Sequence, residues 1–174
     1  MHEHHIVDSS CTAIMNAPME KIDIPAWCFS RPERAYQGCS PAHVSAGCTT
    51  APDGKRMAIN VEIIGGSLMV QHYVEMLDRK DHLLLDSASD VFTPTGRTRM
   101  HVTWELSVKG VGKGKCACTN RVRSYATEER LTCLARQGIP FDPCRAPRQP
   151  ASIAHNQGET PLCAASIARA ALRN

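Results

Sequence analysis

The sequence has no apolar run approaching the roughly 20 residues that a membrane-spanning helix requires. Its first residues also lack the basic segment and hydrophobic stretch that mark a secretory signal. The 20 basic and 17 acidic residues are spread along the chain, without the basic stripe that binds nucleic-acid phosphates. We therefore expect a cytoplasmic protein with no membrane span and no nucleic-acid partner.

Several catalytic and cofactor motifs are also missing. The chain contains no G-x-G-x-x-G, no P-loop and no G-x-S-x-G sequence. The glycine-rich residues 109–115 lack the helix start that would make them a phosphate cradle, which favours a flexible hairpin. We therefore expect no cofactor.

Nothing in the sequence indicates disulfides or a metal centre. The nine cysteines are odd in number and irregularly spaced, so we interpret them as reduced thiols. The C-x-C pair Cys116 and Cys118 has no histidine partner at zinc-finger spacing, and an H-E-x-x-H motif is absent. The histidine-rich residues 1–5 are interpreted as a disordered tail. We expect no bound metal.

The composition is that of an ordinary globular protein. Of the 174 residues, 43% are hydrophobic and 21% are charged, which fits one domain around one core. We therefore treat residues 1–174 as a single domain.

Extended segments alternate with turn residues through most of the chain. Pro52-Asp53-Gly54 and Gly65-Gly66 are strong turn sequences, the second because glycine accepts positive φ at both central positions of a tight hairpin. The turn and alternation pattern predicts strands over residues 6–16, 44–50, 57–64, 67–77, 82–92, 97–108 and 116–125.

Helices are predicted on either side of this meander. A helical turn follows Pro18, and a Ser30-x-x-Glu33 capping box predicts a short helix over residues 33–39. Thr127 is a good N-cap for a helix over 128–137. After a proline-rich connection at 140–150, helical composition resumes at 151, with Thr160-Pro161 as a new start.

Each predicted strand can be divided into two faces, because successive side chains point to opposite sides of a sheet. The more apolar face is assigned to the interior, and it comprises Met57, Ile59, Val61, Ile63, Leu68, Val70, His72, Val74, Met76, Met100, Val102, Trp104, Leu106 and Val108. The other face is expected to meet water or another subunit, so a homodimer is one option. The predicted C-terminal helix covers the interior face, through a narrow apolar stripe of Cys163, Ile167 and Ala170.

This order of elements, with a first strand ending in Asn16-Ala17-Pro18-x-Glu20, resembles the START-like (SRPBCC) superfamily from Ile6 to about Leu172. That superfamily includes birch-pollen allergens, polyketide aromatase/cyclases and lipid-transfer domains. The resemblance implies an α+β helix-grip fold, in which a curved seven-stranded antiparallel sheet wraps a C-terminal helix. It also implies an internal cavity for a hydrophobic small molecule. The proline-rich residues 140–150 depart from the long last helix of the family.

His72 is the leading catalytic candidate, because it interrupts an otherwise apolar strand face and is expected to point into the cavity. A desolvated imidazole there is suited to the proton transfers of a cyclisation, dehydration or isomerisation. The alternative is a core histidine bonded to a backbone carbonyl or water. Asn120 is a second candidate, for orienting a carbonyl or hydroxyl group. The candidate ligand-binding residues are Val70, Val74, Ser87, Ser89, Val102 and Trp104.

Three alternatives remain open at this stage. A non-catalytic carrier or sensor has the same cavity without the chemistry, and a metal-dependent hydrolase needs a ligand cluster that the sequence does not assemble. If the two faces are exchanged, the candidates on the other face are Tyr73, Glu75, His101, Glu105, Arg121 and Arg123. His43 is interpreted as a solvated loop residue near the cavity mouth.

Overall fold

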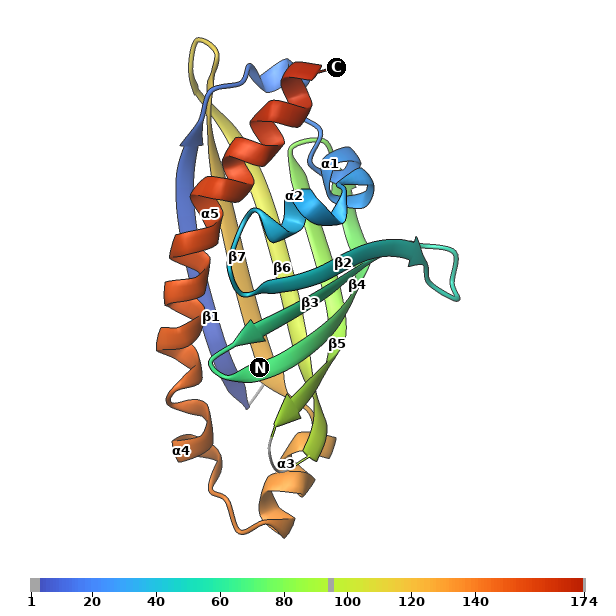
Figure 1. Cartoon of the computed structure of the whole chain (residues 1–174), viewed down its shortest axis with the longest axis vertical. Helices are drawn as coiled ribbons and strands as arrows, with labels where there is room; N and C mark the ends of the chain where they lie inside the picture. Colours follow the sequence, from blue (N-terminus) through green and yellow to red (C-terminus); the bar gives the residue numbers. More distant parts are fainter. Residues whose placement is uncertain (1–3, 94–95, 174) are drawn as a thin grey trace.

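The computed structural model describes residues 4–93 and 96–173, in one α+β arrangement (Figure 1). Pro94 and Thr95, within the predicted turn at 93–96, lie outside the described residues. The strands are β1 (His5–Met15), β2 (His43–Thr50), β3 (Arg56–Ile64), β4 (Ser67–Arg79), β5 (His82–Thr93), β6 (Gly96–Gly112) and β7 (Lys115–Ala126). The helices are the 3₁₀ turn η1 (Met19–Lys21), α1 (Ile24–Ser30), α2 (Glu33–Gln37), α3 (Glu128–Arg136), α4 (Phe141–Arg145) and α5 (Arg148–Arg173).

The seven strands form one antiparallel sheet in the order β1-β7-β6-β5-β4-β3-β2, which confirms the predicted fold class. Gly65 and Gly66 have φ of 56° and 75°, as the predicted hairpin between β3 and β4 requires. The sheet is strongly bent, so that β2 and β3 cross in front of β6 and β7 (Figure 1). β1 already includes His5, one residue earlier than predicted.

The last helix runs lengthwise across the concave side of this sheet (Figure 1). Cys163 and Ile167 are buried as predicted, whereas Ala170 is only partly buried. The predicted new start at Thr160-Pro161 is wrong, because α5 continues through Pro161. The Thr160 hydroxyl bonds back to the carbonyl oxygen of Asn156 at 2.6 Å instead of capping a new helix.

Of the two caps predicted for the short helices, the structure confirms one. The Thr127 hydroxyl accepts a hydrogen bond from the Arg130 N–H, which confirms the predicted cap of α3. The capping box at Ser30 is wrong, because α2 begins after Pro32 and the Ser30 hydroxyl donates to the Ala26 carbonyl of α1. Trp27 of α1 donates its indole N–H to Ser166 at 3.1 Å, which ties α1 to α5.

The interior face was predicted correctly for β6 but wrongly for β3 and β4. The inward residues of β6 are Met100, Val102, Trp104, Leu106 and Val108. On β3 and β4 the buried side chains are instead Ala58, Asn60, Glu62, Ser67, Met69, Gln71 and Tyr73. The more apolar face of these two strands points outward, where Ile63 and Met76 are 51% and 57% exposed. A homodimer stays a prediction.

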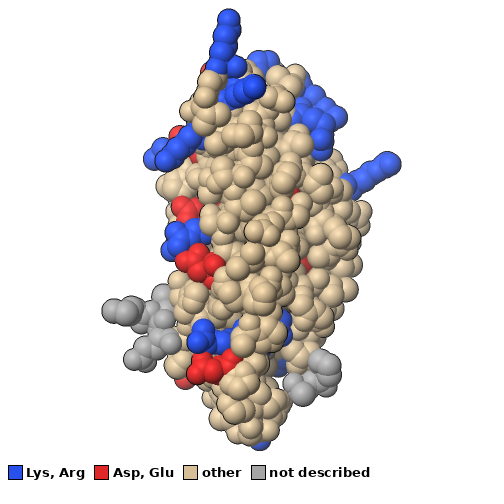
Figure 2. All heavy atoms as spheres, turned by 90° about the vertical axis from the view of Figure 1, so that its left-hand side faces the viewer, with Lys and Arg blue, Asp and Glu red and all other residues tan. Residues whose placement is uncertain are grey.

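All nine cysteines are free. Within the described residues, no helix is long and apolar enough to cross a membrane. On the side of the molecule formed by β1 and α5, scattered charged side chains lie among wide stretches of uncharged residues (Figure 2).

Packing of α5 against the sheet is expected to contribute much of the stability of the fold. Ile167 on α5 is 1% exposed, whereas Leu162 on the same helix is 46% exposed. Ile167→Ala should lower the free energy of unfolding by about 2–5 kcal/mol through lost burial and a cavity. Leu162→Ala should change it by less than about 0.5 kcal/mol. Urea unfolding followed by circular dichroism measures both, and equal losses would contradict this placement of α5.

Candidate functional site

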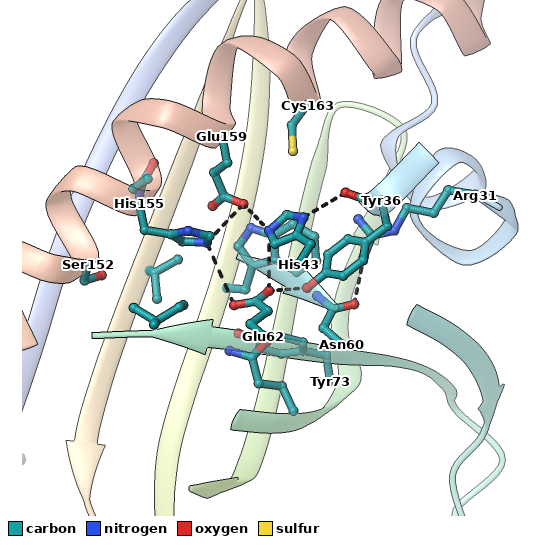
Figure 3. Close-up of a pocket in the computed structure, with 15 residues that line it drawn as sticks. Arg31, Tyr36, His43, Asn60, Glu62, Tyr73, Ser152, His155, Glu159 and Cys163 are labelled. Carbon is teal, nitrogen blue, oxygen red and sulfur yellow. Dashed lines mark hydrogen bonds and ion pairs between the residues drawn. The ribbon is translucent and has the colours of Figure 1, made fainter. Parts of the chain in front are cut away.

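Four ionisable side chains from three elements meet on the concave side of the sheet (Figure 3). Glu159 and His155 lie four residues apart on α5, so both side chains point to the same side of the helix. His43 begins β2 and is paired across the ladder with Glu62 of β3. We call these four residues the His–Glu cluster. His43, Glu62 and Glu159 are less than 10% exposed, and His155 is only partly exposed.

The two imidazoles share one carboxylate oxygen. The Nε2 atoms of His43 and His155 lie 3.2 and 3.4 Å from Glu159 Oε2. The same nitrogen atoms lie 3.8 and 3.9 Å from the two carboxylate oxygens of Glu62. The cluster therefore places two carboxyl groups around two ring nitrogens within a space that excludes most water.

Further hydrogen bonds fix the orientation of each cluster residue. His43 Nδ1 lies 2.8 Å from the carbonyl oxygen of Tyr36, which can only accept, so Nδ1 carries a hydrogen and Nε2 faces the cluster. The Tyr36 hydroxyl donates to Glu62. Asn120 of β7 donates to Glu159 Oε1 at 3.0 Å. His155 Nδ1 lies 3.5 Å from the Ser40 hydroxyl, so hydrogen bonds hold all four side chains before any ligand binds.

The environment moves the pKa values of the two carboxyl groups in opposite directions. Burial raises the pKa of Glu62, and the negative charge of Glu159 raises it further. Burial also acts to raise the pKa of Glu159, but hydrogen bonds from His155 and His43 outweigh it and lower this pKa to about 2. Glu159 is therefore the charged member of the pair, and Glu62 is the one that more readily holds a proton.

The two histidines are stabilised in their charged form. Burial acts to lower the pKa of His43 and of His155, but the hydrogen bonds to Glu159 and the charge of Glu62 outweigh it and raise both. Burial raises the pKa of Tyr36, as does its proximity to Glu62, so its hydroxyl remains a hydrogen-bond donor. The arrangement is suited to holding, accepting and donating protons.

The His–Glu cluster borders a cavity of about 40 Å³. An adjoining, more apolar chamber of about 50 Å³ lies beside it, and the two share Ile64, Gln71, Val122 and Ser152 as lining residues. Among the described residues, Gln71 Oε1 and the Ser124 hydroxyl are buried without a hydrogen-bond partner. Each of these atoms lies in a side chain that lines a chamber, which provides bonding capacity for a ligand or for water.

Arg31 closes one side of the cavity. Its guanidinium lies 4.5 to 5.4 Å from the ring centres of Tyr36, Trp27 and Trp104, and it donates to Asn60 at 2.8 Å. Arg31 also lines a surface groove of about 310 Å³ between α1 and α5. Because Arg31 lines both spaces, movement of its side chain would connect the cavity with this groove.

Three donor atoms of the cluster have the arrangement of metal ligands. The ligand atoms of His43, His155 and Glu159 all lie within 4.8 Å of one another. Two imidazoles and one carboxylate are a donor set typical of zinc. The prediction of no metal took no account of this cluster, since its members come from separate elements.

The predicted position of His72 is wrong. His72, Val70 and Val74 point to the outer face of β4 and are only partly buried, while Gln71 and Tyr73 point inward. The prediction assumed that the more apolar face is the interior one, but here the cavity side of β3 and β4 carries the polar groups of the site. The backbone N–H of His72 donates to the Ser87 hydroxyl, and its imidazole has no place in the cavity.

The other predicted residues do lie on the interior side. Asn120 is fully buried and contacts the cluster, where it donates to Glu159 and accepts from the indole N–H of Trp104. Trp104 borders the His–Glu chamber, and Val102 borders the apolar chamber. Ser87 and Ser89 are buried and hydrogen-bonded to each other at 3.0 Å. Their roles in binding or catalysis stay predictions.

Most of the alternative candidates on the opposite face are engaged in ion pairs, including one between Glu105 and Arg123. On the outer face, His101 pairs with Asp86, Arg121 with Asp8, and Glu105 with both His82 and Arg123. Glu75 pairs with Arg56. Tyr73 alone of that predicted set lies inside, 5.5 Å from Trp104 between ring centres. The interpretation of His43 as a solvated loop residue is wrong, because it is 7% exposed and begins β2.

Sequence reasoning missed four members of the site: Tyr36, Glu62, His155 and Glu159. Two signals were present in the chain. Asn60 and Glu62 alternate on one face of a predicted strand, and Asn156, Glu159 and Thr160 follow His155 at helical spacing on the buried face of α5. Neither signal could be recognised as a site without knowing that the two faces oppose each other in space.

Comparison with known proteins supports the fold. No family model matches the sequence, and no curated protein matches it at a significant level. The solved structure of the Zhui aromatase/cyclase from Streptomyces sp. R1128 is similar at a TM-score of 0.64 and 12% identity, covering 95% of this chain and 94% of that one. A protein designated TTHA0849 from Thermus thermophilus is similar at a TM-score of 0.53 and 11% identity, covering 95% and 97%.

A longer protein is also similar. The di-domain aromatase/cyclase StfQ from the steffimycin biosynthetic pathway aligns at a TM-score of 0.61 and 13% identity, covering 98% of this chain and 53% of that one. The present chain thus spans about half the length of that enzyme. Together with the sheet order and α5, these similarities show that the chain has the same helix-grip fold as these aromatase/cyclases, as the resemblance to the START-like superfamily implied.

Proposed function

We propose that the protein binds a small molecule with an apolar or aromatic body and an oxygen-bearing group, and catalyses its cyclisation, dehydration or isomerisation by proton transfer. The observation that carries this proposal is an apolar chamber that shares four lining residues with the cavity bordered by the buried His–Glu cluster. The apolar chamber suits the body of the ligand, and the cluster suits its polar group.

The residues around the two chambers have different roles, which depend on where their side chains lie. Glu62 borders the cavity and accepts from the Tyr36 hydroxyl, so it can exchange a proton with a ligand oxygen or carbon beside it. Asn120 is a positioning residue, since it orients Glu159 rather than facing the ligand. Gln71 and Ser124 offer free acceptor capacity along the chamber wall.

The size of the cavity limits the ligand. The two chambers, of about 40 and 50 Å³, are well below the roughly 300 Å³ of a drug-sized binding pocket. A ring-sized ligand therefore requires the cavity to widen, and we propose that Arg31, which lines both the cavity and the groove at α1 and α5, moves to open it. The aromatase/cyclase names of the similar structures support the reaction class, while the substrate has to be found by experiment.

Ligand binding is expected to depend on Gln71. Gln71→Leu removes a buried oxygen that has no partner in the described chain, so the free energy of unfolding should rise by about 1–2 kcal/mol. Affinity for hydroxylated aromatic ketones of one to three rings should fall about tenfold or more. Quenching of tryptophan fluorescence measures binding, because Trp104 borders the cavity.

The matched control for this test is His72→Leu, the neighbouring residue on β4 that points outward. It should leave the affinity of the same ketones within about twofold. Equal losses of affinity in the two variants would contradict binding in this cavity. Failure of the whole panel to bind the wild-type chain would contradict the proposed ligand class.

Catalysis is expected to depend on Glu62. With a ligand found in the binding panel as substrate, Glu62→Gln should lower turnover by about 10²–10⁴-fold, as loss of a general acid or base does. Ligand affinity should change by less than about tenfold. Product formation followed by liquid chromatography measures the effect, and Glu75→Gln on the outer rim of β4 is the control that should retain activity.

Two outcomes would contradict the catalytic proposal. Unchanged turnover in Glu62→Gln would remove Glu62 from the mechanism. Recovery of every bound ligand in unchanged form from the wild-type chain would indicate a carrier or sensor instead of an enzyme.

A further inference from the structure

We infer that His43, His155 and Glu159 form a binding site for one zinc ion, with the Glu62 carboxyl group beside its open fourth position. This inference does not rest on the proposed function, because ion binding requires no organic ligand. It follows from the placement of the donor atoms, from the hydrogen bonds behind them and from the burial of the site.

The donor atoms of the cluster lie at distances close to those between the ligands of a zinc ion. Zinc bonds of about 2.0–2.1 Å in a tetrahedron place neighbouring ligand atoms roughly 3.3–3.4 Å apart. Glu159 Oε2 lies 3.2 Å from His43 Nε2 and 3.4 Å from His155 Nε2. The oxygens of Glu62 lie 3.8 and 3.9 Å from the same nitrogens. All three ligand atoms lie within 4.8 Å of one another, so a side-chain adjustment that brings the two imidazoles closer together would let them surround one ion.

Hydrogen bonds on the far side of the ligands orient them toward a common point. A histidine that binds zinc usually donates its other ring N–H to a carbonyl or carboxylate, which fixes the free nitrogen toward the metal. His43 does this through Nδ1 and the Tyr36 carbonyl at 2.8 Å. His155 Nδ1 lies 3.5 Å from the Ser40 hydroxyl, and Asn120 holds the outer oxygen of Glu159 at 3.0 Å.

The donor types and the surroundings select the ion. Two imidazole nitrogens with carboxylate oxygens suit zinc, whereas magnesium and calcium prefer oxygen ligands alone. Three protein ligands leave a position open toward the cavity that adjoins the apolar chamber. An ion there would polarise a ligand oxygen next to Glu62, the residue that the proposed function assigns to proton transfer.

The chain offers competing metal donors that the experiment has to exclude. The sequence begins with a histidine-rich segment and contains nine cysteines, of which Cys48 is exposed. The test therefore uses the full-length chain carrying His2→Ala, His4→Ala and His5→Ala as the reference. Cobalt(II) serves as a second probe, because thiolate ligands add an intense near-ultraviolet band that nitrogen and oxygen ligands do not give.

Isothermal titration of the chelator-treated reference chain with zinc chloride should show uptake of one ion per chain. Glu159→Gln and His155→Gln should each lower the affinity for zinc by about 100-fold or more, and Asn120→Ala should lower it by about 10–100-fold. His72→Gln, on the outer face of β4, should leave it unchanged. Cobalt should give visible bands of a four- or five-coordinate site without the thiolate band.

A measurement on the chain with an intact cluster tests the inference even if a cluster variant fails to fold. In the reference chain, zinc should raise the midpoint of thermal unfolding, because an ion that binds only the folded state stabilises it. Absence of zinc uptake, uptake that His155→Gln leaves unchanged, or a cobalt spectrum with thiolate bands would each overturn the inference. Zinc uptake without any ketone binding would leave the inference standing and contradict only the proposed ligand class.

Discussion

The site depends on one constraint, the burial of two carboxyl groups, Glu62 and Glu159, in the same small cavity. A buried charge is costly unless a partner compensates it, and here two histidines supply both charge and hydrogen bonds. The side chains that compensate these charges and the carboxyl groups themselves come from the start of β2, the inner face of β3 and the middle of α5. The constraint also accounts for Asn120 on β7 and Tyr36 on α2, which donate to Glu159 Oε1 and Glu62 Oε1. Buried ion pairs seldom add stability compared with apolar residues of similar size, so the cluster is better explained by function than by folding.

The sequence allowed the architecture to be predicted because turns and alternation are local properties. Gly65-Gly66 needs positive φ wherever it occurs, and the strands on either side follow from it. The START-like fold could then be recognised from the order of elements. The sequence did not reveal that α5 passes through Pro161, since a proline near a good capping residue usually starts a helix. Tertiary contacts on the buried face of α5, such as the indole of Trp27 with Ser166, favour the continuous helix.

The candidate site could be predicted only in part, for a physical reason. The rule that apolar faces point inward holds for β6, which packs in the core, and fails for β3 and β4, whose inner side borders a polar cavity. For this reason the prediction placed His72 in the cavity and placed Gln71 and Tyr73 outside it. Asn120 and Trp104 were found because β6 and β7 obey the rule. His43, Glu62, His155 and Glu159 are separated by up to 116 residues, and no local pattern brings them together.

The central claim is that the His–Glu cluster is retained for ligand or ion binding and not for stability. The most direct test is the free energy of unfolding of one variant that replaces His43, Glu62, His155 and Glu159 by leucine and Tyr36 by phenylalanine. Asn120 keeps its bonds to Thr160 and Trp104 in this variant, so few polar groups lose their partners. The account predicts a folded protein whose stability, measured by urea unfolding without metal or ligand, is within about 1 kcal/mol of the wild type or higher. A loss of more than about 3 kcal/mol would show that the cluster stabilises the fold, and would contradict the account.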